Sequence, residues 1–144
     1  KSSPLKSLIC PKELIPSLID ELPILFVIAS LTKGISKFNA INEATKKESN
    51  RIKEMHKVLR QIGISCKSTS DAMTIHGEKI VNSKKKHIVV NTKGDHRICM
   101  ASVILALATG IKMKVKNFET VNTSFPNFIT LLKNIGGKIE IKKK

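Results

Sequence analysis

Aromatic side chains are scarce in this 144-residue chain, which has five phenylalanines and neither tryptophan nor tyrosine. Proteins that bind single-stranded nucleic acid stack bases on such rings, so the scarcity argues against that class despite a formal net charge of +15. The charge is also dispersed, since lysines occur along nearly the whole sequence and the densest runs are only 84–86 and 142–144. We interpret most lysines as solvated surface. We expect no nucleic-acid partner and keep a basic nucleic-acid-binding module as an alternative.

Cysteines and long apolar runs are also few. The three cysteines are widely spaced, and no two of them have the spacing of a zinc site or a redox dithiol. We therefore expect reduced thiols, no bound metal and a cytoplasmic protein. The longest apolar runs, 24–31 and 103–108, are too short to cross a bilayer, so we expect no membrane association.

The length and the hydrophobic content of 41% suit one globular domain with a substantial core. The chain opens with Lys1 rather than methionine. We therefore expect it to be part of a longer protein.

Hydrophobic periodicity predicts two passes through one order of elements. The first pass has a helix over 20–32 with Asp20 as its N-cap, a strand over 35–38, an amphipathic helix over 49–62, and strands over 64–67 and 72–76. The second has a strand over 88–90, a helix over 95–109, a strand over 112–116, a helix over 126–135, and a strand over 138–141. Local sequence supports the repeat, because LTKGISKF at 31–38 resembles LATGIKMK at 107–114, and LRQIG at 59–63 resembles LKNIG at 132–136. We predict a pseudo-symmetric α/β fold of two repeats, 1–80 and 81–144, joined at the polar run 81–86.

Arginine is rare, since only three of the 26 basic residues are arginines, and two of the three fall at predicted helix starts. These two are Arg51 and Arg97. A cation at a helix N-terminus opposes the helix dipole, so each placement needs a compensating interaction. A guanidinium holds a carboxylate or phosphate through two parallel hydrogen bonds, which favours a bound anionic substrate. The alternative is internal ion pairing, of Arg51 with Glu48 or Glu54 and of Arg97 with Asp95.

Other charged residues near the helix starts are equally ambiguous. Asp20 and Glu48 either perform acid/base chemistry on an anionic substrate or only stabilise helix N-termini. His96 is either a proton shuttle or a structural residue. His56, His76 and His87 have no spacing with it that is typical of metal ligands.

Four stretches carry a resemblance to a known family. They are LIDELPILFVIAS at 18–30, KESNRIKEM at 47–55, GDHRICMAS at 94–102 and TSFPNFITLLKNIGG at 123–137. In this order they resemble the C-terminal part of the EPSP synthase (3-phosphoshikimate 1-carboxyvinyltransferase) family of enolpyruvyl transferases. The resemblance covers nearly the whole chain. It implies a monomeric enzyme of two inverse α/β barrel domains, each with three pseudo-symmetric βαβαββ units. This chain would hold about two of those units, without the N-terminal part of the enzyme and the partner domain.

The resemblance also implies a reaction and roles for particular residues. The enolpyruvyl group of phosphoenolpyruvate is transferred to the 5-hydroxyl of shikimate 3-phosphate, with release of phosphate through a tetrahedral intermediate, in aromatic amino-acid biosynthesis. No metal or organic cofactor is implied. Asp20 matches the aspartate that contacts and deprotonates the shikimate hydroxyl, and Lys47 matches a lysine that binds the same substrate. Glu48 matches the acidic residue that handles the proton on the phosphoenolpyruvate methylene carbon. Arg51 and Arg97 match two arginines that grip phosphoenolpyruvate, and His96 is a supporting residue.

Two positions depart from the family pattern. Asn50 stands where many members have an aspartate that orients the arginine at position 51, and Thr123 stands where many have a lysine. The related enolpyruvyl transferase that acts on UDP-N-acetylglucosamine shares the architecture and is the nearest alternative. The KES-Arg and Asp-His-Arg elements favour the shikimate enzyme. Because the implied site lies between two domains, we expect this chain to be inactive alone.

Overall fold

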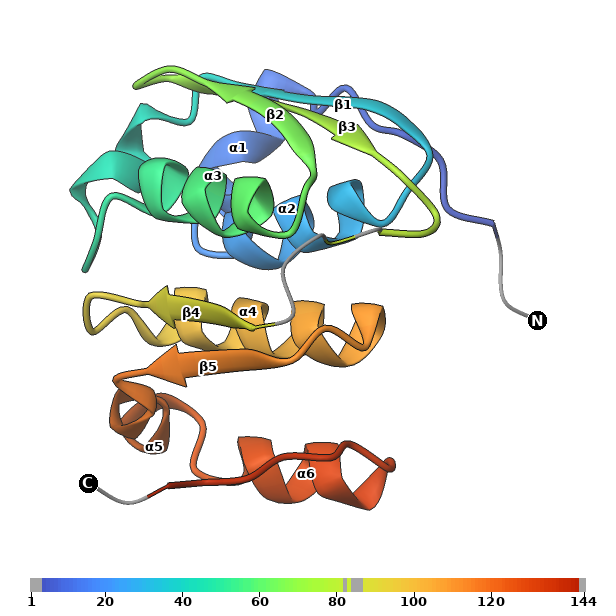
Figure 1. Ribbon diagram of the computed structural model, residues 1–144. Helices are drawn as coiled ribbons and strands as arrows, with labels where there is room; N and C mark the ends of the chain where they lie inside the picture. The colour runs from blue at the N-terminus through green and yellow to red at the C-terminus, as the bar shows by residue number, and fades with distance from the viewer. Residues whose placement is uncertain (1–3, 82, 84–86, 143–144) are drawn as a thin grey trace.

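The computed structural model describes residues 4–81, 83 and 87–142, which form two sheets with helices between and beside them (Figure 1). The first sheet has the order β1-β3-β2, all antiparallel, with β1 at Gly34–Asn39, β2 at Ser65–Ser68 and β3 at Ala72–Gly77. The second sheet pairs β4 (Ile88–Asn91) in parallel with β5 (Met113–Lys116). This mixture of helix and sheet agrees with the predicted α/β class.

The helices fill the space beside and between these sheets. They are α1 (Ile15–Leu18), α2 (Leu22–Ser30), α3 (Arg51–Gln61), α4 (His96–Thr109), α5 (Val121–Ser124) and α6 (Phe128–Asn134), with short 3₁₀ helices at Lys12–Leu14, Asn42–Lys46 and Phe118–Thr120. Helix α2 contacts β3, α3 and α4, while α4 also contacts β5. The two helices α2 and α4 are apolar around most of their circumference, which is typical of helices inside a core. Among the described residues, no helix combines the length and hydropathy that a bilayer crossing requires.

The spacing of apolar residues along each element explains which of its side chains are buried. On α3, the buried residues Ile52, Met55, Val58 and Leu59 form one stripe at helical spacing. On β4, Ile88 and Val90 are buried while their neighbours are exposed. Most of these residues belong to one apolar core that includes residues from both halves of the chain. The two halves therefore share their interior.

Two parallel strand pairs, one in each half of the chain, enclose a helix in the same way. Before α2, Ile9 pairs in parallel with Lys37 of β1, through hydrogen bonds from Cys10 N to Lys37 O and from Lys37 N to Leu8 O, each 2.8 Å. Residues 8–10, α2 and β1 thus form a parallel strand-helix-strand arrangement. The same arrangement recurs as β4, α4 and β5. The sequence pattern missed the first of these strands because Pro11 follows it at once and the pairing is a single bridge.

Several predicted boundaries are wrong. Helix α2 begins at Leu22, and Asp20 is not its cap, because the Asp20 carboxylate is bound to side chains elsewhere. The helix predicted over 126–135 is present as α6, which begins two residues later at Phe128, and the sequence pattern missed the short helix α5 that lies before Pro126. Residues 138–141 form no strand, because no strand among the described residues pairs with them, and Ile139 instead packs against the cluster around Phe128. Within the predicted joint at 81–86, residues 82 and 84–86 lie outside the described residues.

Candidate functional site

The guanidinium of Arg51 lies at the centre of a carboxylate cluster at the start of α3. Its Nε donates to Asp95 Oδ2 over 2.9 Å, its Nη1 to Asp20 Oδ1 over 2.7 Å, and its Nη2 to Glu48 Oε2 over 2.5 Å. The side chain is only 1% exposed. Burial opposes the charged form, but the bonds to Asp95 and Asp20 outweigh it and raise the pKa of Arg51. The buried cation is therefore balanced within the protein.

The backbone before α3 explains how Glu48 reaches Arg51. Lys47 is extended, and Asn50 caps the helix by accepting a hydrogen bond from Lys53 N on its Oδ1 over 3.0 Å. Residues 47–49 therefore lie outside the helix and fold back toward its first turn. Among the described residues, the Asn50 side chain bonds only to Lys53. The structure thus gives Asn50 a capping contact and no bond to Arg51.

Asp95 is fully buried and joins the starts of two helices. Its Oδ1 caps α4 by accepting from Arg97 N over 2.9 Å and from Ile98 N over 3.3 Å. Its Oδ2 accepts from Arg51 Nε and from Ser49 Oγ, each over 2.9 Å. Sequence reasoning considered Asp95 only as a partner for Arg97 and missed Ser49. The available signal was an aspartate at a helix start, which does not reveal a partner 44 residues away.

Arg97 lies beside the same cluster but is partly exposed, at 29% of its side chain. Its Nη1 donates to Glu21 Oε1 over 2.6 Å and to the backbone oxygen of Asp20 over 2.9 Å. The predicted ion pair with Asp95 is wrong, because Asp95 accepts from the Arg97 backbone instead. Of the pairs predicted for Arg51, the one with Glu48 is present, whereas Glu54 pairs with Lys57.

The outer part of the cluster is open to solvent. Lys47 Nζ lies 3.2 Å from Asp20 Oδ1, and the side chains of Lys47, Asp20 and Glu48 are 31%, 44% and 48% exposed. The hydrogen bond from Arg51, partly offset by burial and reinforced by Lys47, lowers the pKa of Asp20. Asp20 is thus an ionised carboxylate at neutral pH, held against two cations.

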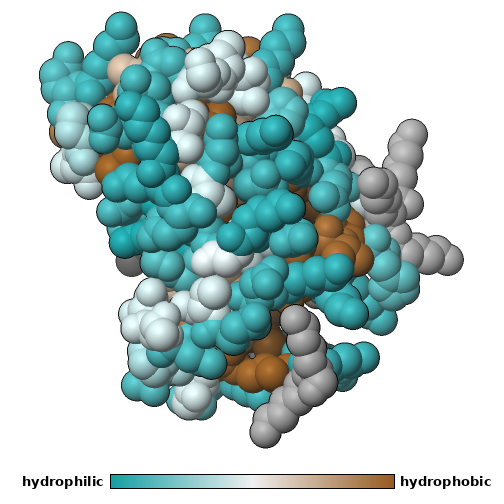
Figure 2. All heavy atoms as spheres, turned by 90° about the vertical axis from the view of Figure 1, so that its left-hand side faces the viewer, coloured by the Kyte–Doolittle hydropathy of each residue, from teal (hydrophilic) through white to brown (hydrophobic). Residues whose placement is uncertain are grey.

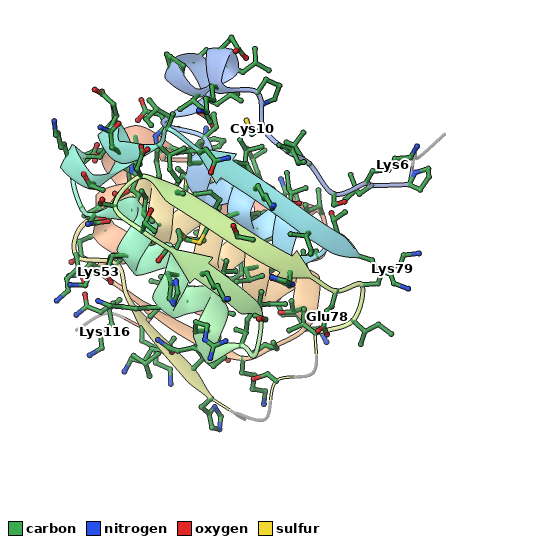
Figure 3. The ribbon with its side chains drawn as sticks, turned by 90° about the horizontal axis from the view of Figure 1, so that it is seen from above. Lys6, Cys10, Lys53, Glu78, Lys79 and Lys116 are labelled. Atoms are coloured by element: carbon green, nitrogen blue, oxygen red, sulfur yellow. The ribbon has the colours of Figure 1, made fainter. Side chains whose placement is uncertain are left out.

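The cluster lies where the ends of several helices and strands meet. In Figure 1 the first turns of α3 and α4 and the carboxyl ends of β4 and β5 all lie on the left-hand side. Figure 2 looks onto that side, which is mostly hydrophilic with smaller apolar patches. Seen from above, Lys53 and Lys116 lie on this side, and Lys6 and Lys79 lie on the opposite one (Figure 3). The structure therefore brings Asp20, Lys47, Glu48, Arg51 and Arg97 to one edge, with Arg51 buried beneath it.

Among the residues that the structure describes, the remaining candidates make no hydrogen bond to this cluster. His96 is the first residue of α4, and within the described part of the chain its ring makes no hydrogen bond. His56 Nδ1 is 2.8 Å from Ser68 Oγ, and burial lowers the pKa of this ring. No group of three His, Cys, Asp or Glu side chains among the described residues is placed to hold a metal ion. A groove of about 240 Å³ between α3 and β4 is lined by residues such as Lys57, Val89 and Lys93, and by none of the predicted site residues.

Comparison with known proteins decides the family. A profile of EPSP synthase (3-phosphoshikimate 1-carboxyvinyltransferase) matches residues 5–132. The chain belongs to the EPSP synthase family. It is 34% identical over 139 residues to 3-phosphoshikimate 1-carboxyvinyltransferase of Paramagnetospirillum magneticum, a match covering 96% of this chain and 31% of that protein. It is 37% identical over 138 residues to the enzyme of that name from Xanthomonas axonopodis pv. citri, a match covering 96% of this chain and 30% of that protein.

The solved structures agree with this family. An EPSP synthase structure from Acinetobacter baumannii superposes with a TM-score of 0.88 at 32% sequence identity, covering 96% of this chain and 32% of that one. The fold is thus that of a part of EPSP synthase. The chain spans about a third of the length of the EPSP synthases that it matches.

Proposed function

We propose that this chain supplies part of the active site of a 3-phosphoshikimate 1-carboxyvinyltransferase, which transfers the enolpyruvyl group of phosphoenolpyruvate to the 5-hydroxyl of shikimate 3-phosphate. One observation carries the proposal beyond family membership. Asp20 meets Arg51 and Lys47 through its carboxylate and Arg97 through its backbone oxygen, at a partly exposed edge. Three cations around one ionised carboxylate suit two substrates that both carry phosphate and carboxylate groups.

Arg97 is the arginine best placed to bind an anion directly. Among the described residues only its Nη1 has hydrogen-bond partners, so Nε and Nη2 are left for a ligand. These two groups form one edge of the guanidinium, which suits a carboxylate held through two parallel bonds. We assign this edge to phosphoenolpyruvate.

Arg51 is less accessible, because its Nη groups already bind Asp20 and Glu48. An oxygen of phosphoenolpyruvate reaches Arg51 only if it replaces or joins one of these carboxylates. Both are nearly half exposed and are therefore free to turn toward substrate. In the proposal, Arg51 both organises the two carboxylates and supplies positive charge to the transition state.

Asp20 and Glu48 carry the proton transfers in this proposal. Asp20 accepts the proton of the 5-hydroxyl while the hydroxyl oxygen bonds to the central carbon of phosphoenolpyruvate, and Glu48 donates a proton to the methylene carbon, which becomes a methyl group. The tetrahedral intermediate then loses phosphate with its bonding electrons, and one methyl proton returns to Glu48, which restores the double bond. An anion that takes the place of the Asp20 carboxylate at Arg51 and Lys47 removes the contacts that lower the Asp20 pKa, so this pKa rises and Asp20 becomes a stronger base.

The site proposed here is incomplete in this chain. We propose that it is closed by the N-terminal part of the enzyme and its partner domain, that the two repeats 1–80 and 81–144 belong to one domain, and that the complete enzyme is a cytoplasmic monomer. Buried, unpaired Cys10, Cys66 and Cys99 support a reducing compartment. Burial raises the pKa of the Cys99 thiol to about 12, which protects it from oxidation.

A chimera tests the function. Residues 5–142 replace the matching third of the Acinetobacter baumannii EPSP synthase, and phosphate release is measured with both substrates. We expect turnover by the chimera, none by the isolated chain, and a loss of about a hundredfold or more in kcat for Asp20→Asn. Lys79→Gln, on the opposite side of the molecule, is the control and should leave kcat unchanged (Figure 3). A folded chimera without phosphate release, or an Asp20→Asn variant with unchanged kcat, would refute the proposal.

A further inference from the structure

We propose that Ser49 is a positioning residue of this site. Its hydroxyl fixes the carboxylate of Asp95, and Asp95 in turn holds Arg51 in the orientation that directs both Nη groups toward Asp20 and Glu48. That Ser49 orients Arg51 through Asp95 concerns this chain alone. The effect of this orientation on catalysis rests on the proposed function.

The three carboxylates around Arg51 differ in how firmly they are held. Asp20 and Glu48 are 44% and 48% exposed, whereas Asp95 is fully buried at the start of α4. Exposed side chains change rotamer freely and follow a guanidinium as it moves. Only Asp95 provides a fixed point. The orientation of Arg51 therefore depends on the single bond from Nε to Asp95 Oδ2.

The acceptor oxygen of that bond is itself held by Ser49. The backbone amides of Arg97 and Ile98 bind only Oδ1 of Asp95. The second oxygen, Oδ2, has two donors, Arg51 Nε and Ser49 Oγ, both at 2.9 Å. Without the Ser49 hydroxyl, Oδ2 of Asp95 keeps only one of its two hydrogen-bond donors, Arg51 Nε. The carboxylate is then held against rotation about its Cβ–Cγ bond mainly by the amides that bind Oδ1.

Ser49 also ties the segment before α3 to the start of α4. It follows Lys47 and Glu48 directly, so the bond from its hydroxyl to Asp95 anchors the short stretch that carries both side chains. The neighbouring Asn50 does not serve this purpose, because its side chain caps α3 by accepting from Lys53 N. The hydroxyl of Ser49 is thus the polar group through which the 47–49 stretch reaches Asp95.

The scarcity of arginine makes the claim testable on the chain as it stands. With Arg51, Arg60 and Arg97 as its only arginines, the protein has three guanidinium Nε–H signals in an NMR spectrum. Arg51→Lys identifies one of them by its loss. We expect the Arg51 Nε–H to exchange with water about five- to tenfold faster in Ser49→Ala than in the wild type, since one hydrogen bond to the charged pair is lost.

Two further variants make the test specific. Ser49→Thr keeps a hydroxyl and should restore slow exchange, whereas Ser49→Val has the shape of threonine without the hydroxyl and should behave like Ser49→Ala. Thr109→Val removes a hydroxyl that donates to Leu105 O over 2.7 Å at the far end of α4, and should leave the Arg51 signal unchanged. Unaltered exchange of the Arg51 Nε–H in Ser49→Ala, with Ser49→Val like the wild type, would overturn the proposal whatever the activity of the enzyme.

The chimera separates this claim from the proposed function. If both hold, Ser49→Ala and Ser49→Val lower kcat about tenfold or more, and Ser49→Thr recovers it. If the parent chimera is inactive, the proposed function fails, while the exchange rates still decide whether Ser49 positions Arg51. A fall in melting temperature for Ser49→Ala with unchanged exchange and kcat would show a structural bond only and would refute the proposal.

Discussion

Arg97 donates a hydrogen bond from Nη1 to the backbone carbonyl oxygen of Asp20 over 2.9 Å, although 77 residues separate the two. A backbone acceptor stays in place whatever side chain stands at position 20. The start of α4 is thereby tied to the turn before α2, and the side chains of Asp20 and Arg97 are kept at the same edge. The position of Arg97 is thus set by backbone geometry as well as by its ion pair with Glu21.

Replacing Arg97 with lysine tests whether its free edge binds substrate. In the chimera, Arg97→Lys keeps the charge but loses the pair of parallel donors, and each charge-assisted hydrogen bond contributes about 1.5–3 kcal/mol. We expect kcat/KM for phosphoenolpyruvate to fall about ten- to a hundredfold. The melting temperature should change little, because the side chain is partly exposed. Arg60→Lys, on the exposed side of α3, is the control. Intact kinetics with a lowered melting temperature would identify Arg97 as a structural ion-pair partner.

Arg51 should be far more important for stability. Arg51→Met leaves the buried Asp95 without its cation, and breaking such a pair typically costs about 3–5 kcal/mol. We expect a loss of that size in the free energy of unfolding of the 144-residue chain, measured with urea. Adding Asp95→Asn removes the unpaired charge and should recover part of the loss. Arg60→Met should change stability by less than about 0.5 kcal/mol. A small effect of Arg51→Met would contradict the buried ion pair.

Gly77 is a position where backbone packing admits no side chain. A Cβ added to Gly77 would collide with the carbonyl oxygens of Ala29 and Thr32, at the end of α2. We expect Gly77→Ala to lower the free energy of unfolding by about 2–3 kcal/mol, because the backbone must shift to admit the methyl group. Gly136→Ala has free space but a φ of +93°, so it should cost only about 1 kcal/mol. Equal effects for the two variants would argue against the close contact of β3 with α2.

Acid should weaken the fold partly through Asp20. The hydrogen bond from Arg51 lowers the Asp20 pKa below its usual 3.8, so below that pH the unfolded chain binds more protons than the folded one. The stabilisation is present above about pH 4 and is lost as the pH falls through the folded pKa. We expect the free energy of unfolding to fall less steeply between about pH 4 and 2 in Asp20→Asn than in the wild type. Glu43→Gln removes an exposed carboxylate and is the control. Identical slopes for the wild type and Asp20→Asn would show that Asp20 is not coupled to folding.

The regular elements of the fold were largely predictable, because they follow from local patterns. The stripe of Ile52, Met55 and Leu59 predicted α3, and Gly110, with a φ of +69°, ends α4 as its position indicated. The strand predicted over 138–141 failed for a non-local reason. An alternating sequence specifies a strand only where another strand edge is available to pair with it.

The site was predictable by residue type but not by contact. Arginines at helix starts, beside carboxylates, indicated a site that binds an anion. The alternative interpretation was internal ion pairing, and Arg51 does pair with Glu48. The sequence does not show that Asp95 turns inward to Arg51 rather than outward to Arg97. That choice depends on the packing of α3 against α4, which brings together residues 44 positions apart. Ser49 was missed for the same reason.

The bond between Asp95 and Arg51 affects how cooperatively the protein unfolds. Asp95 caps α4, so opening of that helix releases a charged acceptor from Arg51 and disturbs α3 as well. The apolar core likewise includes residues from both halves. Neither half of the chain retains its full set of contacts once the other half has unfolded. The chain should therefore unfold in a single cooperative transition. The backbone amides of α3 and α4 should then exchange with solvent with similar opening free energies.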